Sequence, residues 1–202
     1  MNLKMDKLLY WFGLIIFYIY FTIFHRWEIT GRNNIPDSGP LLVMANHTSN
    51  FDPPVLGCAL KKRVYFLGKK ELFNNLLFKW IFNNLGVIPI KRGKPDISAI
   101  KKVFKTLKDN KMLVLFPEGT RNRSGKLGEA KAGSIMIALK SKTPILPVGI
   151  KNIRKKGENT QISIGKPFKL DKFYDKKLSD KEKKEAGNYI MNKIEAQLNK
   201  LQ

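Results

Sequence analysis

The feature that most constrains the fold is a series of short, almost wholly apolar runs separated by segments with helical periodicity. The runs are LLVMA (41–45), VYFLG (64–68), VIPI (87–90), MLVLF (112–116) and ILPVGI (145–150). Short runs that are apolar throughout are typical of strands in a sheet whose two faces are both covered. Their alternation with helical segments predicts an α/β sandwich.

The segments between these runs supply the predicted helices, over residues 74–85, 95–109 and 129–141. In the second of them, Ile97, Ile100, Phe104 and Leu107 are predicted to line one face, with lysines on the other, as in an amphipathic helix. Residues 158–165 are predicted to form a later strand. Ser179 and Glu182 have the spacing of a capping box, which predicts that a last helix begins there.

An N-terminal run of 17 residues, 8–24, carries no formal charge and contains eight aromatic residues. As a helix it would extend about 26 Å, slightly less than the roughly 30 Å hydrocarbon core of a bilayer. The sequence FHRWEIT at its end lacks the small residues of a signal-peptide cleavage site. We predict that residues 1–27 form an uncleaved membrane-anchor helix and that residues 28–202 form one domain with a basic C-terminal tail and helix. A buried core helix is the alternative for the N-terminal run.

The charge balance, 38 Lys and Arg against 16 Asp and Glu, gives a net charge of +22 and predicts an anionic partner. We expect a lipid surface rather than nucleic acid, because an anchor is present and a nucleic-acid-binding motif is not. The single cysteine, Cys58, excludes an internal disulfide and a cysteine metal cluster. This favours the cytoplasmic face of the cell membrane, and neither a metal nor another cofactor is expected.

His47 and Asp52 are the first candidates for catalysis, within NHTSNFDPP (46–54) directly after the 41–45 run. A histidine at a strand end, with one ring nitrogen held by a carboxylate, is a workable general base. The carboxylate fixes the tautomer and stabilises the imidazolium that forms. A histidine that only bonds a loop carbonyl is the alternative, and this pair alone does not decide between them.

A second motif, FPEGTR (116–121), would emerge at the same edge of the sheet if the strands are parallel. Gly119 permits close backbone approach, Thr120 adds a hydroxyl, and Arg121 offers a planar fork suited to phosphate oxygens. Glu118 either orients a substrate hydroxyl or holds the loop.

A third motif, GVIPIKRG (86–93), places Arg92 at another strand exit. Two arginines at strand exits predict a phosphate clamp, with solvated turns as the alternative.

Taken in order, these motifs resemble the sequence blocks of the glycerolipid acyltransferases. HTSNFD is similar to their His-x4-Asp block, and GVIPIKR, FPEGTR and TPILPV resemble the second, third and fourth blocks. KKELF (69–73) resembles an element between the first two. The likeness covers roughly residues 28–165 and is greatest to bacterial 1-acyl-sn-glycerol-3-phosphate acyltransferases of the PlsC type.

The resemblance implies a mixed, largely parallel central sheet flanked by helices. It implies acyl transfer from acyl-CoA or acyl carrier protein to the free sn-2 hydroxyl of lysophosphatidic acid, with His47 and Asp52 in catalysis. The substrate-binding residues it implies are Lys69, Arg92, Glu118, Gly119, Thr120 and Arg121.

Several alternatives stay open at this stage. The acceptor could be glycerol 3-phosphate, another lysophospholipid or an amino-acid lipid, and Ser49 or Cys58 could act as a covalent nucleophile. A membrane-tethered nucleic-acid-binding module is supported by charge alone. A hydrolase would need a nucleophile elbow such as G-x-S-x-G, which the sequence lacks.

Overall fold

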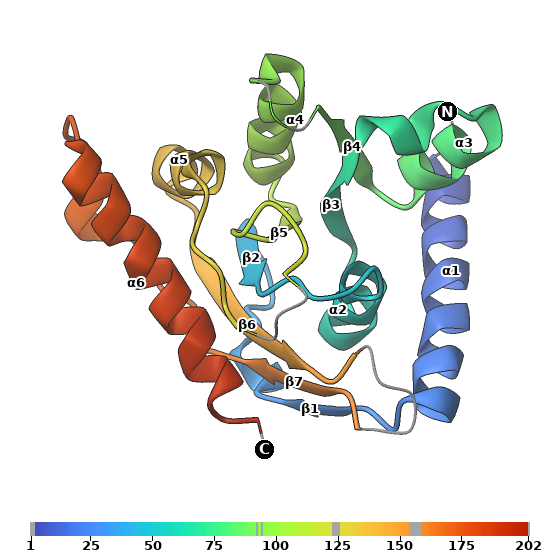
Figure 1. Ribbon diagram of the computed structural model, residues 1–202. Helices are drawn as coiled ribbons and strands as arrows, with labels where there is room; N and C mark the ends of the chain where they lie inside the picture. Colours follow the sequence, from blue (N-terminus) through green and yellow to red (C-terminus); the bar gives the residue numbers. More distant parts are fainter. Residues whose placement is uncertain (1–2, 92, 94, 123–125, 154–158, 202) are drawn as a thin grey trace.

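The computed structural model describes residues 3–91, 93, 95–122, 126–153 and 159–201. These residues build a seven-stranded sheet with the spatial order β1-β7-β6-β2-β5-β3-β4 (Figure 1). The strands from β6 to β4 run parallel, β7 is antiparallel to β6, and β1 is parallel to β7. The mixed, largely parallel sheet is therefore confirmed. The strands are β1 (Glu28–Thr30), β2 (Leu41–Ala45), β3 (Val64–Lys69), β4 (Val87–Ile90), β5 (Met112–Leu115), β6 (Ile145–Lys151) and β7 (Gln161–Ile164).

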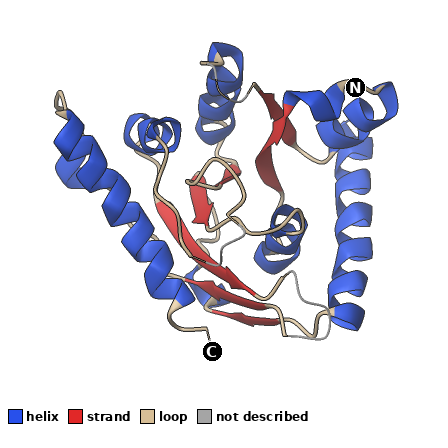
Figure 2. Cartoon of the chain, viewed as in Figure 1, coloured by secondary structure: helices blue, strands red, loops and turns tan. Residues whose placement is uncertain are grey.

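Helices cover both faces of the sheet (Figure 2). In the described part of the chain they are α1 (Leu3–Phe24), α2 (Asp52–Leu60), α3 (Leu76–Asn84), α4 (Ile97–Lys108), α5 (Ala132–Ser141) and α6 (Asp180–Leu198). Short 3-10 turns are η1 (Arg32–Asn34), η2 (Lys70–Phe73) and η3 (Asp171–Phe173).

The strand order decides which face each helix covers. The chain moves outward from β2 to β3 and from β3 to β4, then back from β4 to β5 and from β5 to β6. Because crossovers between parallel strands are right-handed, connections made in opposite directions lie on opposite faces. Accordingly α2 and α3 share a face with α1, whereas α4 and α5 share the other face with α6 (Figure 1).

The core consists of one apolar cluster on each face. In β2, Leu41 and Val43 pack toward α1 and α2, whereas Leu42 and Met44 pack toward α4, α5 and α6. Every residue of β2 is buried. The wholly apolar composition of this strand thus follows from burial on both sides, as the sequence pattern predicts.

Side-chain caps define where several helices begin. Asn75 accepts hydrogen bonds from the first amides of α3, and Asp96 accepts one from the Ala99 amide in α4. The capping box of Ser179 and Glu182 at the start of α6 is confirmed. The sequence pattern misses β1, because three residues are too few to show a periodicity. Strand β7 begins later than predicted, and the first residue of the predicted strand, 158, lies outside the described residues.

The N-terminal run forms α1, and one side of this helix packs on the rest of the fold. Tyr10 and Phe21 are buried in the cluster that α2 also lines. The Val64 amide donates a hydrogen bond to the Tyr10 hydroxyl at 3.0 Å, and burial raises the pKa of Tyr10 to about 12. A Cβ on Gly57 of α2 would come within 2.8 Å of Leu14 Cδ2, so the two helices are in close contact. Among the helices that the structure describes, none has both the length and the apolar character needed to cross a bilayer.

Candidate active site

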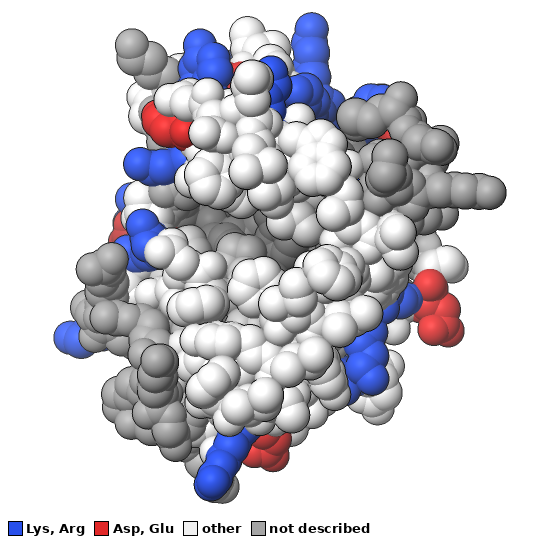
Figure 3. Space-filling view, turned by 90° about the vertical axis from the view of Figure 1, so that its right-hand side faces the viewer, with Lys and Arg blue, Asp and Glu red and all other residues white. Residues whose placement is uncertain are grey.

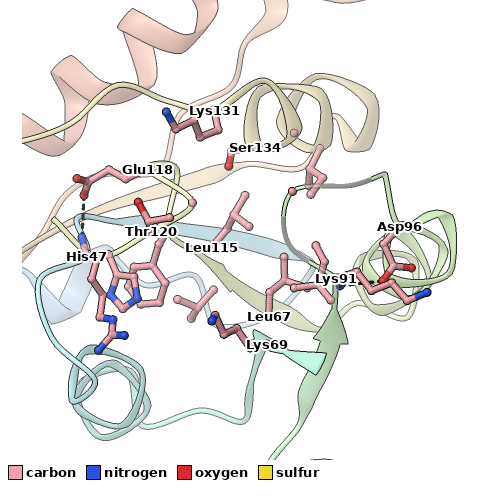
Figure 4. Close-up of a pocket in the computed structure, with 18 of the residues that line it drawn as sticks. His47, Leu67, Lys69, Lys91, Asp96, Leu115, Glu118, Thr120, Lys131 and Ser134 are labelled. Carbon is pink, nitrogen blue, oxygen red and sulfur yellow. Dashed lines mark hydrogen bonds between the residues drawn. The ribbon is translucent and has the colours of Figure 1, made fainter. Parts of the chain in front are cut away.

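The polar motifs that follow β2, β3, β4 and β5 meet at the carboxyl edge of the parallel strands. A cleft of about 660 Å³ opens there (Figure 4). Of the residues predicted from sequence, its lining includes His47, Lys69, Glu118, Gly119, Thr120 and Arg121. Asp52 contacts His47 directly and is fully buried. Arg92 lies outside the described residues.

His47 is held on two sides. Its Nδ1 lies 2.7 Å from Oδ2 of Asp52, and its ring stacks on Phe116 with 4.0 Å between the ring centroids. When Nδ1 donates its proton to the carboxylate, the neutral ring keeps its lone pair on Nε2. In the described part of the chain, no group hydrogen-bonds to Nε2, and the residue lines the cleft. This nitrogen can therefore accept a proton from a hydroxyl bound in the cleft.

Asp52 is oriented by the backbone around it. It is the first residue of α2, where the prolines 53 and 54 are tolerated because the first helical amides have no intrahelical partner. Its Oδ2 accepts hydrogen bonds from the Thr48 amide at 2.6 Å and the Ser49 amide at 2.8 Å, besides the bond from His47. These bonds fix the carboxylate against the His47 ring.

Glu118 joins three parts of the site. Its Oε1 accepts a hydrogen bond from the His47 amide at 2.9 Å (Figure 4). Its Oε2 accepts one from the Gly128 amide at 3.1 Å. A Cβ on Gly128 would lie 2.9 Å from Oε2, so only glycine fits there without displacing the carboxylate. One carboxylate oxygen thus holds the loop that carries His47, and the other holds the segment that contains Gly128.

The loop after β5 is attached to the loop after β2 at two further points. The Asn122 amide donates to the His47 carbonyl at 2.7 Å, and Arg121 Nη1 donates to Asn50 Oδ1 at 2.7 Å. Gly119, which precedes Arg121 and Asn122, adopts a φ of 68°, a left-handed conformation that favours glycine. The FPEGTR motif therefore forms a turn that presents Thr120 and Arg121 to the cleft.

Cationic side chains and apolar walls share the cleft. Lys69, Lys91, Arg121 and Lys131 all line it, and none is ion-paired with another described residue. Hydrogen bonds from the amides of Lys91 and Ala99 hold the pKa of the nearby Asp96 below its usual range. The apolar lining includes Leu67, Leu72, Ile90, Ile100, Val114, Leu115, Phe116, Met136 and Ile137. The combination suits an amphiphilic ligand with an anionic head group.

Several lining residues are missed by reasoning from sequence, among them Asn50, Lys131 and Ser134. Lys131 and Ser134 lie at the start of α5, after a long connection from β5 that has no pattern to place it. The Lys131 amide bonds the Pro117 carbonyl at 2.9 Å, which brings α5 to the FPEGTR turn. Asn50 lies within the first motif. Its position between His47 and Asp52 is the one sequence feature from which it could have been predicted.

The alternative nucleophiles lie away from the cleft lining. Ser49 is buried, and its Oγ accepts a hydrogen bond from the Phe51 amide at 3.2 Å. Cys58 Sγ lies toward the Leu14 carbonyl of α1, and burial raises the pKa of its thiol to about 12. Within the described residues, no group of three or more His, Cys, Asp or Glu is arranged to hold a metal ion.

Comparison with protein families gives a match to the Acyltransferase model over residues 26–151. The 1-acyl-sn-glycerol-3-phosphate acyltransferase of Streptococcus pneumoniae is 30% identical over 189 residues, covering 87% of this chain and 68% of that protein. A chloroplastic enzyme of the same name from Brassica napus is 32% identical over 128 residues, covering 62% of this chain. The matched segment spans only 37% of the length of that plant relative.

A solved structure is similar over nearly the whole chain. It is the crystal structure of PlsC, the 1-acyl-sn-glycerophosphate (LPA) acyltransferase of Thermotoga maritima. The two share 26% sequence identity, with a TM-score of 0.73 and coverage of 98% of this chain and 80% of that one.

Proposed function

Because this chain belongs to the Acyltransferase family, we propose that it transfers an acyl group to the free sn-2 hydroxyl of 1-acyl-sn-glycerol 3-phosphate. The donor is acyl-CoA or acyl carrier protein, and the product is phosphatidic acid for phospholipid biosynthesis. The observation that carries the proposal is the accessible Nε2 of His47, backed by Asp52, in a cleft that combines cations with apolar walls. The identity of the acceptor is inferred from the names of the similar proteins.

The chemistry needs one general base. His47 Nε2 removes the proton of the acceptor hydroxyl while Asp52 stabilises the imidazolium. The oxygen attacks the thioester carbonyl, a C–O bond forms as the C–S bond breaks, and the leaving thiolate takes the proton from His47. No acyl-enzyme is required, in keeping with the positions of Ser49 and Cys58.

The remaining candidate residues bind the substrates. Arg121 and Lys69 carry the positive charge that an acceptor phosphate needs, and we include Arg92 from the sequence motif. The apolar walls of the cleft suit an acyl chain. Glu118 acts on acceptor binding indirectly, because its hydrogen bond to the His47 amide positions the loop that carries His47.

We further propose that α1 attaches the enzyme to the cytoplasmic face of the cell membrane. Its outward side carries exposed apolar residues, among them Leu8, Phe12 and Ile23. The net charge of +22 favours an anionic surface, and a chain with one cysteine suits a reducing compartment.

The test uses the protein in lipid nanodiscs with lysophosphatidic acid and a long-chain acyl thioester, following thioester loss and phosphatidic acid formation. The wild type should form phosphatidic acid, and His47→Ala should lose about 10²–10⁴-fold in rate. Ser49→Ala and Cys58→Ala are matched controls, since neither side chain takes part in the proposed chemistry.

The outcomes separate the alternatives. Thioester loss without phosphatidic acid would indicate another acceptor, to be identified with glycerol 3-phosphate and other lysolipids, or a hydrolase. A His47→Ala protein as active as the wild type would exclude the proposed base. Loss of activity in Ser49→Ala or Cys58→Ala, with folding intact, would favour a covalent route.

A further inference from the structure

Helix α3 exposes apolar side chains on most of its surface. Leu76, Leu77, Phe78 and Trp80 are 82%, 61%, 52% and 48% exposed, and Lys79 is the only charged residue of the helix. A surface helix of a globular domain normally turns polar residues to water. A contiguous apolar surface of this kind marks an interaction site.

The apolar surface of α3 continues onto α1. The exposed residues of α1 recur every three or four positions, which places them on one side of the helix. They include Leu8, Phe12, Ile15, Ile19 and Ile23. The helices touch, because a Cβ on Gly13 would lie 3.3 Å from Cδ2 of Leu85, next to the end of α3. Figure 3 faces this side and shows a broad area without charged side chains, with Lys and Arg toward its margins. We call this surface, formed by the exposed residues of α1 and α3, the α1–α3 face.

The cleft opens beside the same surface. Leu72 lines the cleft and is 45% exposed, and it belongs to η2, the turn directly before α3. The turn is attached to the helix by the Phe73 ring, whose centroid lies 5.7 Å from that of Phe82. An apolar path therefore runs from α3 past Leu72 into the cleft.

We propose that α3 lies in the lipid leaflet beside α1, and that the acceptor enters the cleft from the leaflet along α3 and past Leu72. Lys70 of η2 and Lys79 of α3 are exposed next to these apolar residues and form no ion pair with a described residue. Lysines next to an apolar surface complement an anionic bilayer, because their long side chains reach the phosphates while the apolar groups enter the leaflet. The acceptor's path rests on the proposed function, whereas the contact of α3 with lipid does not.

The test places a reporter on α3 alone. The protein has three tryptophans, Trp11, Trp27 and Trp80. Changing the first two to Phe leaves Trp80 as the only tryptophan, which is excited selectively over the tyrosines at the long-wavelength edge of the absorption band. The protein is mixed with vesicles of phosphatidylcholine and phosphatidylglycerol in equal amounts, with or without bromine on the acyl chains. Trp80 should shift to shorter wavelength on binding and lose most of its fluorescence to the brominated lipid.

A matched control carries its tryptophan on the opposite face of the molecule. Tyr189 of α6 is half-exposed, so Tyr189→Trp in a protein whose native tryptophans are Phe reports from a similar surface position. This variant should bind the vesicles without shift or quenching.

Each other result overturns the inference. It is wrong if the protein binds vesicles while Trp80 emission stays unchanged, or if it does not bind them at all. Emission that is already blue-shifted without lipid, together with a concentration-dependent dimer in ultracentrifugation, would assign the α1–α3 face to a second copy. None of these readouts uses substrate, so they hold whether or not phosphatidic acid is formed.

A second experiment addresses the acceptor's path. Leu77→Glu with Trp80→Glu should lose most of the turnover of lysophosphatidic acid presented in vesicles and keep the turnover of a short-chain acceptor dissolved in water. Tyr189→Glu should change neither. Equal losses with both acceptors would contradict entry along α3.

Discussion

The sheet edge that carries His47 and the α1–α3 face distribute polar and apolar groups in opposite ways. At the edge, buried polar groups find hydrogen-bond partners within the loops, as Glu118 does with the amides of His47 and Gly128. Over the face, large apolar side chains are exposed to water. Leaving apolar area in water costs about 25 cal/mol per Å². The edge is therefore held together by bonds within the folded chain, although the buried Asp52 Oδ1 has no hydrogen-bond partner among the described residues. The face, in contrast, exposes apolar area that only lipid or another apolar surface would cover. We therefore expect turnover and lipid contact to be separable.

The largest effect is expected at the edge, for Asp52→Asn. Asparagine keeps an oxygen for the Thr48 and Ser49 amides but removes the charge that stabilises the His47 imidazolium. The kcat should fall by about 10²–10⁴-fold. Steady-state kinetics in detergent micelles measure it, and vesicle flotation should match the wild type. A kcat within a few-fold of the wild type, in a protein of unchanged Tm, would contradict the pairing mechanism.

A smaller effect at the same edge is expected for Arg121→Ala. Loss of a charge-assisted bond to the acceptor phosphate should raise KM about ten- to a hundred-fold with little change in kcat. Asn50→Ala is the control, since it removes the partner of Arg121 and keeps the cation. Unchanged acceptor KM in both Arg121→Ala and Arg92→Ala would exclude the phosphate clamp.

The close packing of the edge can be tested with two glycines. An added Cβ at Gly128 would meet Glu118 at 2.9 Å, whereas one at Gly133 would meet nothing within 4 Å. Gly128→Ala should therefore lower the free energy of unfolding by about 1–3 kcal/mol, and Gly133→Ala should leave it unchanged or raise it. Thermal denaturation of the two variants measures the difference. Equal free energies of unfolding for Gly128→Ala and Gly133→Ala would mean that the Glu118 side chain can move aside for the added methyl group at little cost.

The smallest effect concerns Lys79, the one cation of helix α3. Lys79→Gln should weaken vesicle binding by about 1 kcal/mol, roughly five-fold, and reduce its dependence on salt. Lys102 is exposed on α4, across the sheet, so Lys102→Gln should leave the partition unchanged. A similar loss in both variants would show that total charge, and not the position of the lysine, governs binding.

Much of the fold follows from local pattern. The five apolar runs became β2 to β6. Strands β2, β5 and β6 are buried along almost their whole length, so both of their faces carry apolar residues, whereas β3 and β4 are buried only in part. The segment 95–109 became α4 and turns its lysines outward, but its buried face is only partly the predicted one. Leu107 is buried as predicted, whereas Ile97 is 67% exposed and Val103 is buried instead. The helical periodicity of 74–85 likewise became α3, but most of its apolar residues lie on the exposed side. Sequence alone therefore shows where α3 begins and ends but leaves its environment undetermined.

Part of the site is also readable from sequence. The first motif and the FPEGTR motif each follow an apolar run, so parallel pairing of β2 with β5 was enough to bring them together. Lys131 reaches the cleft because α5 returns to the FPEGTR turn after a long connection, and nothing local to Lys131 indicates that return. The sequence likewise left open whether Glu118 orients a substrate hydroxyl or holds the loop. The hydrogen bonds from the amides of His47 and Gly128 to its carboxylate favour the second role.

The sequence by itself determined the two-sided strands, the amphipathic helices and the motifs at the strand ends. These depend on side-chain periodicity and on hydrogen bonds between near neighbours, which a local pattern records. Only the tertiary structure decided the strand order, and through it that α3 lies on the face of α1 while α4 lies on the other. Strand order depends on contacts between residues far apart in the chain, such as the pairing of Val43 with Leu146. The spacing of apolar residues within one segment carries no information about such contacts.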